Sequence, residues 1–202
     1  MKNPAQDLAE IKSMMERSKR FLSLSGLSGV LAGGYALAAA SMAYYWLFFP
    51  ASPLDRISEI SRDTLNHLLW TGVALLALAL ATAYLMSRKK SRKSAEQLWS
   101  PAGRQFLTAL FVPVLTGGIL CFALIHQGLF SMIPAAMLVF YGLGLFAAAN
   151  HTLSDIRYLG MGQIVLGLLA AFFPAYGLIS WALGFGLLHI VYGSIMYYKY
   201  DQ

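Results

Sequence analysis

Six long apolar runs constrain the fold of this chain more than any other feature. They lie near residues 21–49, 65–87, 105–126, 130–149, 157–173 and 177–198. A helix needs about 20 apolar residues to cross a hydrocarbon core of about 30 Å, and most of these runs reach that length. Lipid offers the backbone no hydrogen bonds, so a crossing segment must be helical. We therefore predict an all-α integral membrane bundle of six transmembrane helices over residues 21–202.

The composition favours the same class. Hydrophobic residues make up 58% of the 202 residues and charged residues only 12%, about half the share found in ordinary soluble domains. The net charge of +6 does not indicate a nucleic-acid partner, because the basic residues flank the apolar runs and no nucleic-acid-reading domain accompanies them. The sequence contains no zinc motif and no phosphate-binding glycine loop, so we expect neither a metal nor a cofactor.

The basic residues also predict an orientation. They concentrate in the N-terminal segment, in residues 87–104, at Arg157 and at Lys199. The intervening connections carry only Arg56 and Arg62, which stand among three acidic residues. The positive-inside rule then places both termini and the basic loop in the cytoplasm, and we expect a bacterial inner membrane.

Residues 1–20 precede the first run and predict a separate amphipathic helix. Leu8, Ile11 and Met15 form one apolar stripe, while lysines and arginines occupy the other faces. Such a helix lies at the membrane surface. A solvated helical extension is the alternative.

A run of cations follows the second apolar run and consists of Arg88, Lys89, Lys90, Arg92 and Lys93. At a cytoplasmic surface each cation gains about 1 kcal/mol from anionic headgroups. We predict that this run contacts anionic lipids.

The segment SLSGLSGVLAGG, residues 23–34, has two interpretations. In the first, Ser25, Gly29 and Gly33 recur at helical spacing and make a face on which another helix packs closely, within the chain or in a homo-oligomer. In the second, Gly26-Leu27-Ser28-Gly29 is similar to the nucleophile motif of rhomboid intramembrane proteases, which pair their serine with a histidine on a later helix. That resemblance implies a serine hydrolase with Ser28 and His189 as catalytic candidates. We favour packing.

His189 also raises a question of its own, because a titratable group within a span needs an internal partner or a function. A satisfied structural histidine is the first interpretation. The second is a channel or carrier for a small solute, with Pro113, Gly117 and His189 along its path, because transporters place substrates at broken helices. Just before the fifth run, we predict that Ser154 or Asp155 is the N-cap of the fifth helix.

The starts RFL (20–22), RQFL (104–107) and RYL (157–159) suggest three helical hairpins. The last of them, residues 159–199, resembles one repeat of the six-span bacterial acid-resistance membrane proteins, which are built from two-helix units. The opening MMERSKRFLSLSGLSGVLAG resembles a group of small uncharacterised bacterial multi-pass membrane proteins. We therefore expect a non-enzymatic protein of envelope stress or regulation that acts through helix packing and assembly. The carrier and the intramembrane hydrolase are the alternatives.

Overall fold

The structure, a computed structural model, describes residues 25–49, 60–94 and 100–201, without the side chains of residues 93 and 94. The amphipathic helix predicted for residues 1–20 lies outside the described residues. Within them the chain is helical and contains no strand, so the all-α class is confirmed there.

The six predicted runs correspond to helical segments whose ends differ from the prediction by a few residues. The first three are α2 (Gly26–Leu47), α3 (Arg62–Ser94) and α4 (Pro101–His126). The fourth comprises η1 (Phe130–Met132), α5 (Ile133–Ala148) and η2 (Ala149–His151), and the fifth is α6 (Ile156–Phe172). The last comprises η3 (Pro174–Tyr176), α7 (Gly177–Trp181), the π-helix η4 (Ala182–Leu188) and α8 (His189–Tyr200).

Five of these segments are long and apolar enough to cross a membrane. They are α2, most of α3, α4, Phe130–His151 and Pro174–Tyr200. The remaining helix, α6, is apolar but shorter, with 17 residues.

Local sequence explains several helix boundaries. Ser100 caps α4 by accepting a hydrogen bond from the Gly103 amide at 3.1 Å, and Pro101 occupies the first turn. The chain reverses after α4 at Gly128, whose φ of 72° favours glycine. Pro113 lies inside α4, which continues through it to His126.

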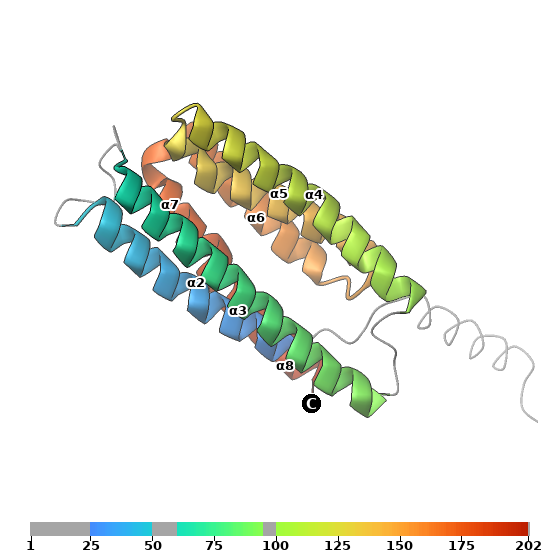
Figure 1. Ribbon diagram of the computed structural model, residues 1–202. Helices are drawn as coiled ribbons and strands as arrows, with labels where there is room; N and C mark the ends of the chain where they lie inside the picture. The colour runs from blue at the N-terminus through green and yellow to red at the C-terminus, as the bar shows by residue number, and fades with distance from the viewer. Residues whose placement is uncertain (1–24, 50–59, 95–99, 202) are drawn as a thin grey trace, which may run out of the picture.

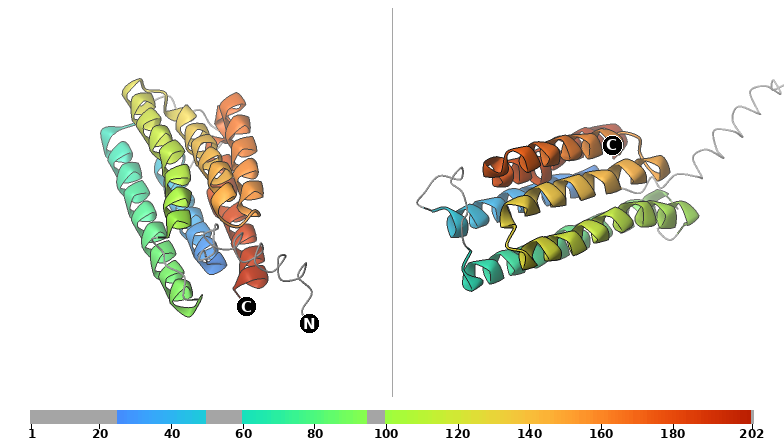
Figure 2. Two further views of the ribbon diagram at one scale, coloured as in Figure 1. Left: turned by 90° about the vertical axis from the view of Figure 1, so that its right-hand side faces the viewer. Right: turned by 90° about the horizontal axis from the view of Figure 1, so that it is seen from above.

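The helices run alongside one another in two groups (Figures 1 and 2). In one, α2 packs between α3 and α8, and in the other, α5 packs between α4 and α6. The segment α7–η4 joins the groups by contacting α2, α5 and α6. We call the end where α2, α4 and α6 begin the basic end, and the opposite end the far end.

This arrangement bears on the three-hairpin prediction. Consecutive helices α2 and α3 pack together, as do α4 and α5. The last helix differs, because α8 packs chiefly against α2 and only weakly against α6. The hairpin description therefore suits the first two pairs better than the last.

Glycines explain why α2 and α8 lie so close. A side chain on Gly193 would meet the backbone of Val30 at 2.5 Å and of Gly26 at 2.7 Å, and one on Gly33 would meet the Gly186 carbonyl at 2.6 Å. Helix α2 therefore touches the backbone of α8 at Gly193 and of η4 at Gly186, and we call this contact the glycine seam.

Candidate functional site

A buried polar cluster lies where α5, α6 and the last segment meet. It consists of Tyr141 on α5, Gln163 on α6, the Gly184 carbonyl in η4 and His189 at the start of α8. Gln163 is fully buried and His189 is 8% exposed. We call these four groups the polar cluster.

The π-helix η4 shapes one side of the cluster. Its Gly184 carbonyl accepts hydrogen bonds from Gln163 Nε2 at 2.8 Å and from His189 Nδ1 at 3.0 Å. A side chain on Gly184 would collide with Leu138 and meet Gln163 Oε1 at 2.5 Å, so glycine lets α6 approach. Single π-turns within helices are rare and frequently occur at functional sites.

The hydrogen bonds fix the protonation of His189. A carbonyl only accepts, so Nδ1 must carry the proton that points to Gly184. In the neutral ring Nε2 then accepts from the Tyr141 hydroxyl at 2.9 Å. Gln163 Nε2 lies 3.4 Å from Nδ1, and because both atoms are donors, this approach is a contact rather than a bond. Both ring nitrogens are thus satisfied by a neutral imidazole.

Gln163 Oε1 is a buried acceptor with no hydrogen-bond partner. It lies 2.5 Å from the position that a side chain on Gly184 would take. An unsatisfied buried acceptor costs free energy, so the two bonds at the Gly184 carbonyl must offset that cost.

Aromatic rings close the cluster. Phe185 lies 5.1 Å from both Tyr141 and Trp181 and 6.0 Å from His189, measured between ring centroids. The rings enclose the imidazole in an apolar setting and hold it against α5.

The structure gives Ser28 and His189 different partners. The Ser28 hydroxyl donates to the Ser25 carbonyl of its own helix at 2.6 Å. The His189 carbonyl faces α2 near Gly29, while its ring points to Tyr141 and Gln163 on the other group. The serine hydroxyl and the imidazole therefore do not form a nucleophile–base pair in this arrangement.

Gly117, one of the residues predicted to line a solute path, packs against α5, and Pro113 lies in the same helix α4. Gly117 is buried against the Phe140 side chain of α5, and a side chain at Gly117 would collide with that ring. The polar cluster instead uses Tyr141, which projects about 100° from Phe140 around the helix axis. Gly117 and His189 therefore contact different side chains of α5.

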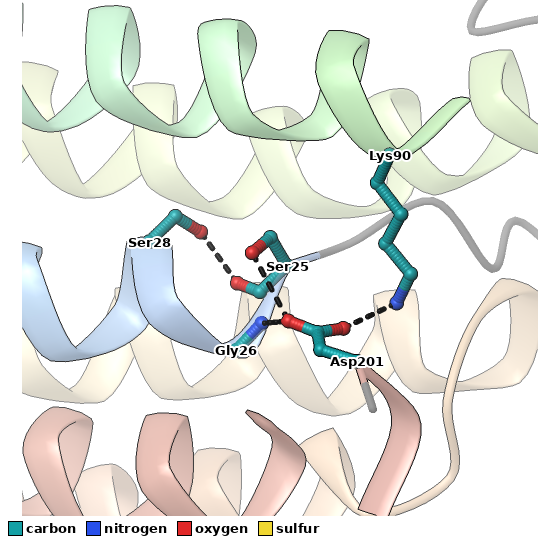
Figure 3. A network of polar contacts seen from close by, with 5 residues as sticks. All are labelled: Ser25, Gly26, Ser28, Lys90 and Asp201. Carbon is teal, nitrogen blue, oxygen red and sulfur yellow. Dashed lines mark hydrogen bonds and ion pairs between the residues drawn. The ribbon is translucent and has the colours of Figure 1, made fainter. Parts of the chain in front are cut away.

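The predicted packing residues lie on the face of α2 that meets α8. Gly29 approaches the Gly193 Cα, and Gly33 approaches Gly186. Ser25 has a second role, because its hydroxyl donates to Asp201 Oδ2 at 3.1 Å (Figure 3). The same carboxylate oxygen accepts from the Gly26 amide at 2.8 Å, so the end of α8 caps the start of α2.

The predicted lipid-contact run divides in the structure. Arg88, Lys89 and Arg92 are exposed, whereas Lys90 Nζ forms an ion pair with Asp201 Oδ1 at 2.6 Å (Figure 3). The Lys93 side chain lies outside the described residues.

A second ion-paired carboxylate lies at the start of α6. Asp155 stands at the N-cap position, but its side chain makes no capping hydrogen bond. It accepts instead from Lys199 Nζ at 2.7 Å and from the Tyr200 hydroxyl at 2.9 Å. Asp155 is thus the N-cap residue of α6, as predicted, but its carboxylate binds Lys199 and Tyr200 instead of the backbone amides of α6.

The sequence analysis missed Tyr141, Gln163 and Asp201. Gln163 carries a readable signal, since an amide within an apolar run needs an internal partner. Tyr141 and Asp201 carry none, because only the fold brings them to His189 and to Gly26. Among the described residues no group of three or more His, Cys, Asp or Glu side chains is placed to hold a metal ion. Comparisons of the chain with known family models, curated proteins and solved structures give no match.

Proposed function

We propose that the chain is a non-enzymatic, six-span protein of a bacterial inner membrane that acts through helix packing and assembly. The glycine seam is the observation that carries this proposal. Lipid gives helices no hydrophobic drive to associate, so close backbone approach at small residues supplies the attraction. This chain uses its small residues in that way within its own bundle.

The packing of α6 supports the sixth span. Its 17 residues cover about 25 Å, slightly less than a hydrocarbon core of about 30 Å. However, α6 packs along α5 and runs beside the longer helices (Figure 1), so a layer that contains α5 also contains α6. Short turns at its ends complete the crossing.

The charge distribution supports the orientation. Exposed basic residues gather at the basic end, among them Arg88, Arg104 and Arg157, while the far end of α3 begins with Arg62 beside Asp63. The positive-inside rule then makes the basic end, where α2 begins and α8 ends, the cytoplasmic one.

An assembly role fits this architecture better than catalysis. Ser28 is bonded to its own helix and His189 is satisfied by Tyr141 and Gly184, so neither side chain is poised for chemistry. A role in envelope stress or regulation follows the resemblance of residues 159–199 to the acid-resistance proteins. The partners in this proposal are anionic lipids at the cytoplasmic face and further copies of the chain. Gly72 and Gly118 have open space around them, which suits contact with a second copy.

The polar cluster favours a second candidate, a carrier or channel for a small solute. A π-helix is frequent at functional sites, and buried ionisable residues within membrane spans mark the pathways of substrates and ions. In this candidate η4 joins Pro113, Gly117 and His189 along the path of the solute.

Thiol accessibility in native membranes tests these functions against each other. After Cys121→Ala, single cysteines replace the buried Ala36 and Ser180, which lie on α2 and α7. Exposed controls are Ser61→Cys at the far end and Ser154→Cys at the basic end. A membrane-impermeant thiol reagent is applied from each side.

We expect Ser61→Cys to react from outside, Ser154→Cys from inside, and both buried positions to stay unlabelled. Labelling of Ala36→Cys and Ser180→Cys would show that water enters the bundle, which would exclude the packing proposal in favour of the carrier. Labelling of both controls from the same side would exclude the six-span topology.

A further inference from the structure

The cations at the end of α3 are neighbours in the sequence, but in the structure they lie on two different faces of the helix. Helix α3 continues without a break to Ser94. Arg88, Lys89 and Arg92 are exposed, and Ser87 and Ser91 are buried. At 100° per residue the three exposed cations lie within an arc of about 100°, on the side opposite the two serines.

Lys90 belongs to the inward face with the serines. Its ammonium pairs with Asp201 Oδ1, and the other oxygen of that carboxylate holds Ser25 and the Gly26 amide (Figure 3). The Asp201 side chain is only 9% exposed, and that of Lys90 is 24% exposed. Lys90 thus ties the end of α3 to the end of α8 and the start of α2, and an ammonium held there does not reach a headgroup.

The exposed face stands at headgroup level. Residues 64–87 contain no Asp, Glu, Lys or Arg and cover about 36 Å as a helix, close to a hydrocarbon core of about 30 Å. Arg88 is therefore the first charged residue beyond the core. Residues 64–94 contain no acidic residue, so no carboxylate on α3 neutralises the exposed cations.

We propose that Arg88, Lys89 and Arg92 form a docking face for anionic phospholipid headgroups, and that Lys90 is a structural strut with no part in lipid binding. The charge complementarity between headgroup phosphates and these three exposed cations, which no carboxylate of residues 64–94 neutralises, identifies the partner. This inference rests on the proposed membrane function and names the residues that carry its lipid contact.

Two neighbouring lysines give a matched test, since Lys89→Gln and Lys90→Gln remove the same charge from opposite faces. The full chain is reconstituted in nanodiscs of phosphatidylcholine mixed with phosphatidylglycerol, and phosphatidylglycerol enrichment around the protein is measured. The midpoint temperature of unfolding is measured in discs of phosphatidylcholine alone.

We expect Lys89→Gln to lower the phosphatidylglycerol enrichment by up to roughly five-fold, the ratio that corresponds to the binding free energy of one cation at an anionic membrane surface. The midpoint temperature of unfolding should stay unchanged. Lys90→Gln should keep the enrichment and lower the midpoint, and Asp201→Asn should lower it in the same way. Arg88→Gln and Arg92→Gln should resemble Lys89→Gln.

Equal loss of enrichment in both lysine variants would overturn the division of the run. An unchanged midpoint temperature in Lys90→Gln would overturn the claim that Lys90 stabilises the fold. Absence of phosphatidylglycerol enrichment in the wild type would overturn the docking face, while the membrane topology stays testable by the thiol labelling of Ser61→Cys and Ser154→Cys.

Discussion

The last helical segment packs against α2 on one side and forms hydrogen bonds with α5 and α6 on the other. Toward α2 it presents Gly193, where the two backbones touch, and Gly186, where the Leu37 side chain of α2 fills the space that a side chain would need. Toward α5 and α6 it presents His189 and the Gly184 carbonyl, which are bound by the Tyr141 hydroxyl and the Gln163 amide. Dispersion forces at close range stabilise the glycine seam, and directed hydrogen bonds stabilise the polar cluster.

This difference predicts how each side responds to mutation. The glycine seam forms because glycine has no side chain, so an added methyl group would push the two backbones apart. The polar cluster depends on matched donors and acceptors, so removing an atom weakens it. Both devices replace the hydrophobic drive that lipid does not supply.

The largest expected effect is that of Gly193→Ala. The added carbon would meet the Val30 amide nitrogen and the Gly26 carbonyl, and neither backbone atom can rotate away. We expect a loss of about 3 kcal/mol of unfolding free energy, at the upper end of the cost of overpacking. Reversible unfolding in mixed micelles measures it.

Gly34→Ala is the matched control on α2. Gly34 has nothing within 4 Å of the position of a side chain, so alanine should stabilise the helix by up to about 1 kcal/mol. If Gly193→Ala were as stable as Gly34→Ala, the glycine seam would not hold the bundle together.

A smaller effect is expected for Gly184→Ala, which adds a methyl group to the polar cluster. Its new neighbours are the ends of the Leu138 and Gln163 side chains, which can shift, whereas the neighbours of Gly193 are backbone. We expect a loss of about 2 kcal/mol. Moving Gln163 should also change the hydrogen-bond shift of the His189 Nδ1 proton, which nuclear magnetic resonance detects. An unchanged proton signal would mean that Gln163 does not set the position of the Gly184 carbonyl.

Removal of the Tyr141 hydroxyl tests the polar cluster by deletion. Tyr141→Phe leaves His189 Nε2 without its donor, and polar contacts between membrane helices contribute about 1 kcal/mol. Tyr35→Phe is the control, because that hydroxyl approaches Thr82 only at 3.4 Å. In unfolding measurements Tyr141→Phe should lose about 1 kcal/mol and Tyr35→Phe clearly less. Equal losses would show that the histidine bond is no stronger than an incidental contact.

Element positions were predictable from the sequence, because lipid forces long apolar runs into helices. The six predicted runs coincide with helical segments, and Gly29 and Gly33 do lie at a helix contact. The helix that packs on them was not predictable. Repeated glycines indicate that some backbone approaches, but the same spacing would suit α4, α8 or a second copy of the chain.

The polar contacts were less predictable than the helices. The positive-inside rule treats Lys89 and Lys90 alike, since it counts charges without assigning them to helix faces. Their separation depends on Asp201, which lies 111 residues further along the chain and reaches Lys90 only after the helices pack. Tyr141 and Gln163 likewise meet His189 through tertiary packing, and the π-helix that places the Gly184 carbonyl has no local sequence signature.

The smallest expected effect concerns Asp155, the carboxylate that joins α6 to the end of α8. The hydrogen bond from Lys199 lowers the pKa of Asp155 below its ordinary value, assisted by Tyr200 and opposed by burial. Because the folded pKa lies below the unfolded pKa of about 4, the contact stabilises the fold above that value. The stabilisation is lost as the pH falls through the lowered folded pKa. Asp155→Asn removes it at any pH.

The midpoint temperature of unfolding should therefore separate wild type from Asp155→Asn at neutral pH, and the difference should vanish in acid. The effect is small because the Lys199 side chain is 54% exposed and water screens the pair. Asp63→Asn, at the exposed start of α3, controls for the loss of a carboxylate elsewhere. A difference that persists unchanged below pH of about 2 would mean that Asp155 acts through packing rather than charge, because its protonated form would then stabilise equally. In that case the contact between α6 and α8 at the basic end would resemble the glycine seam more than the polar cluster.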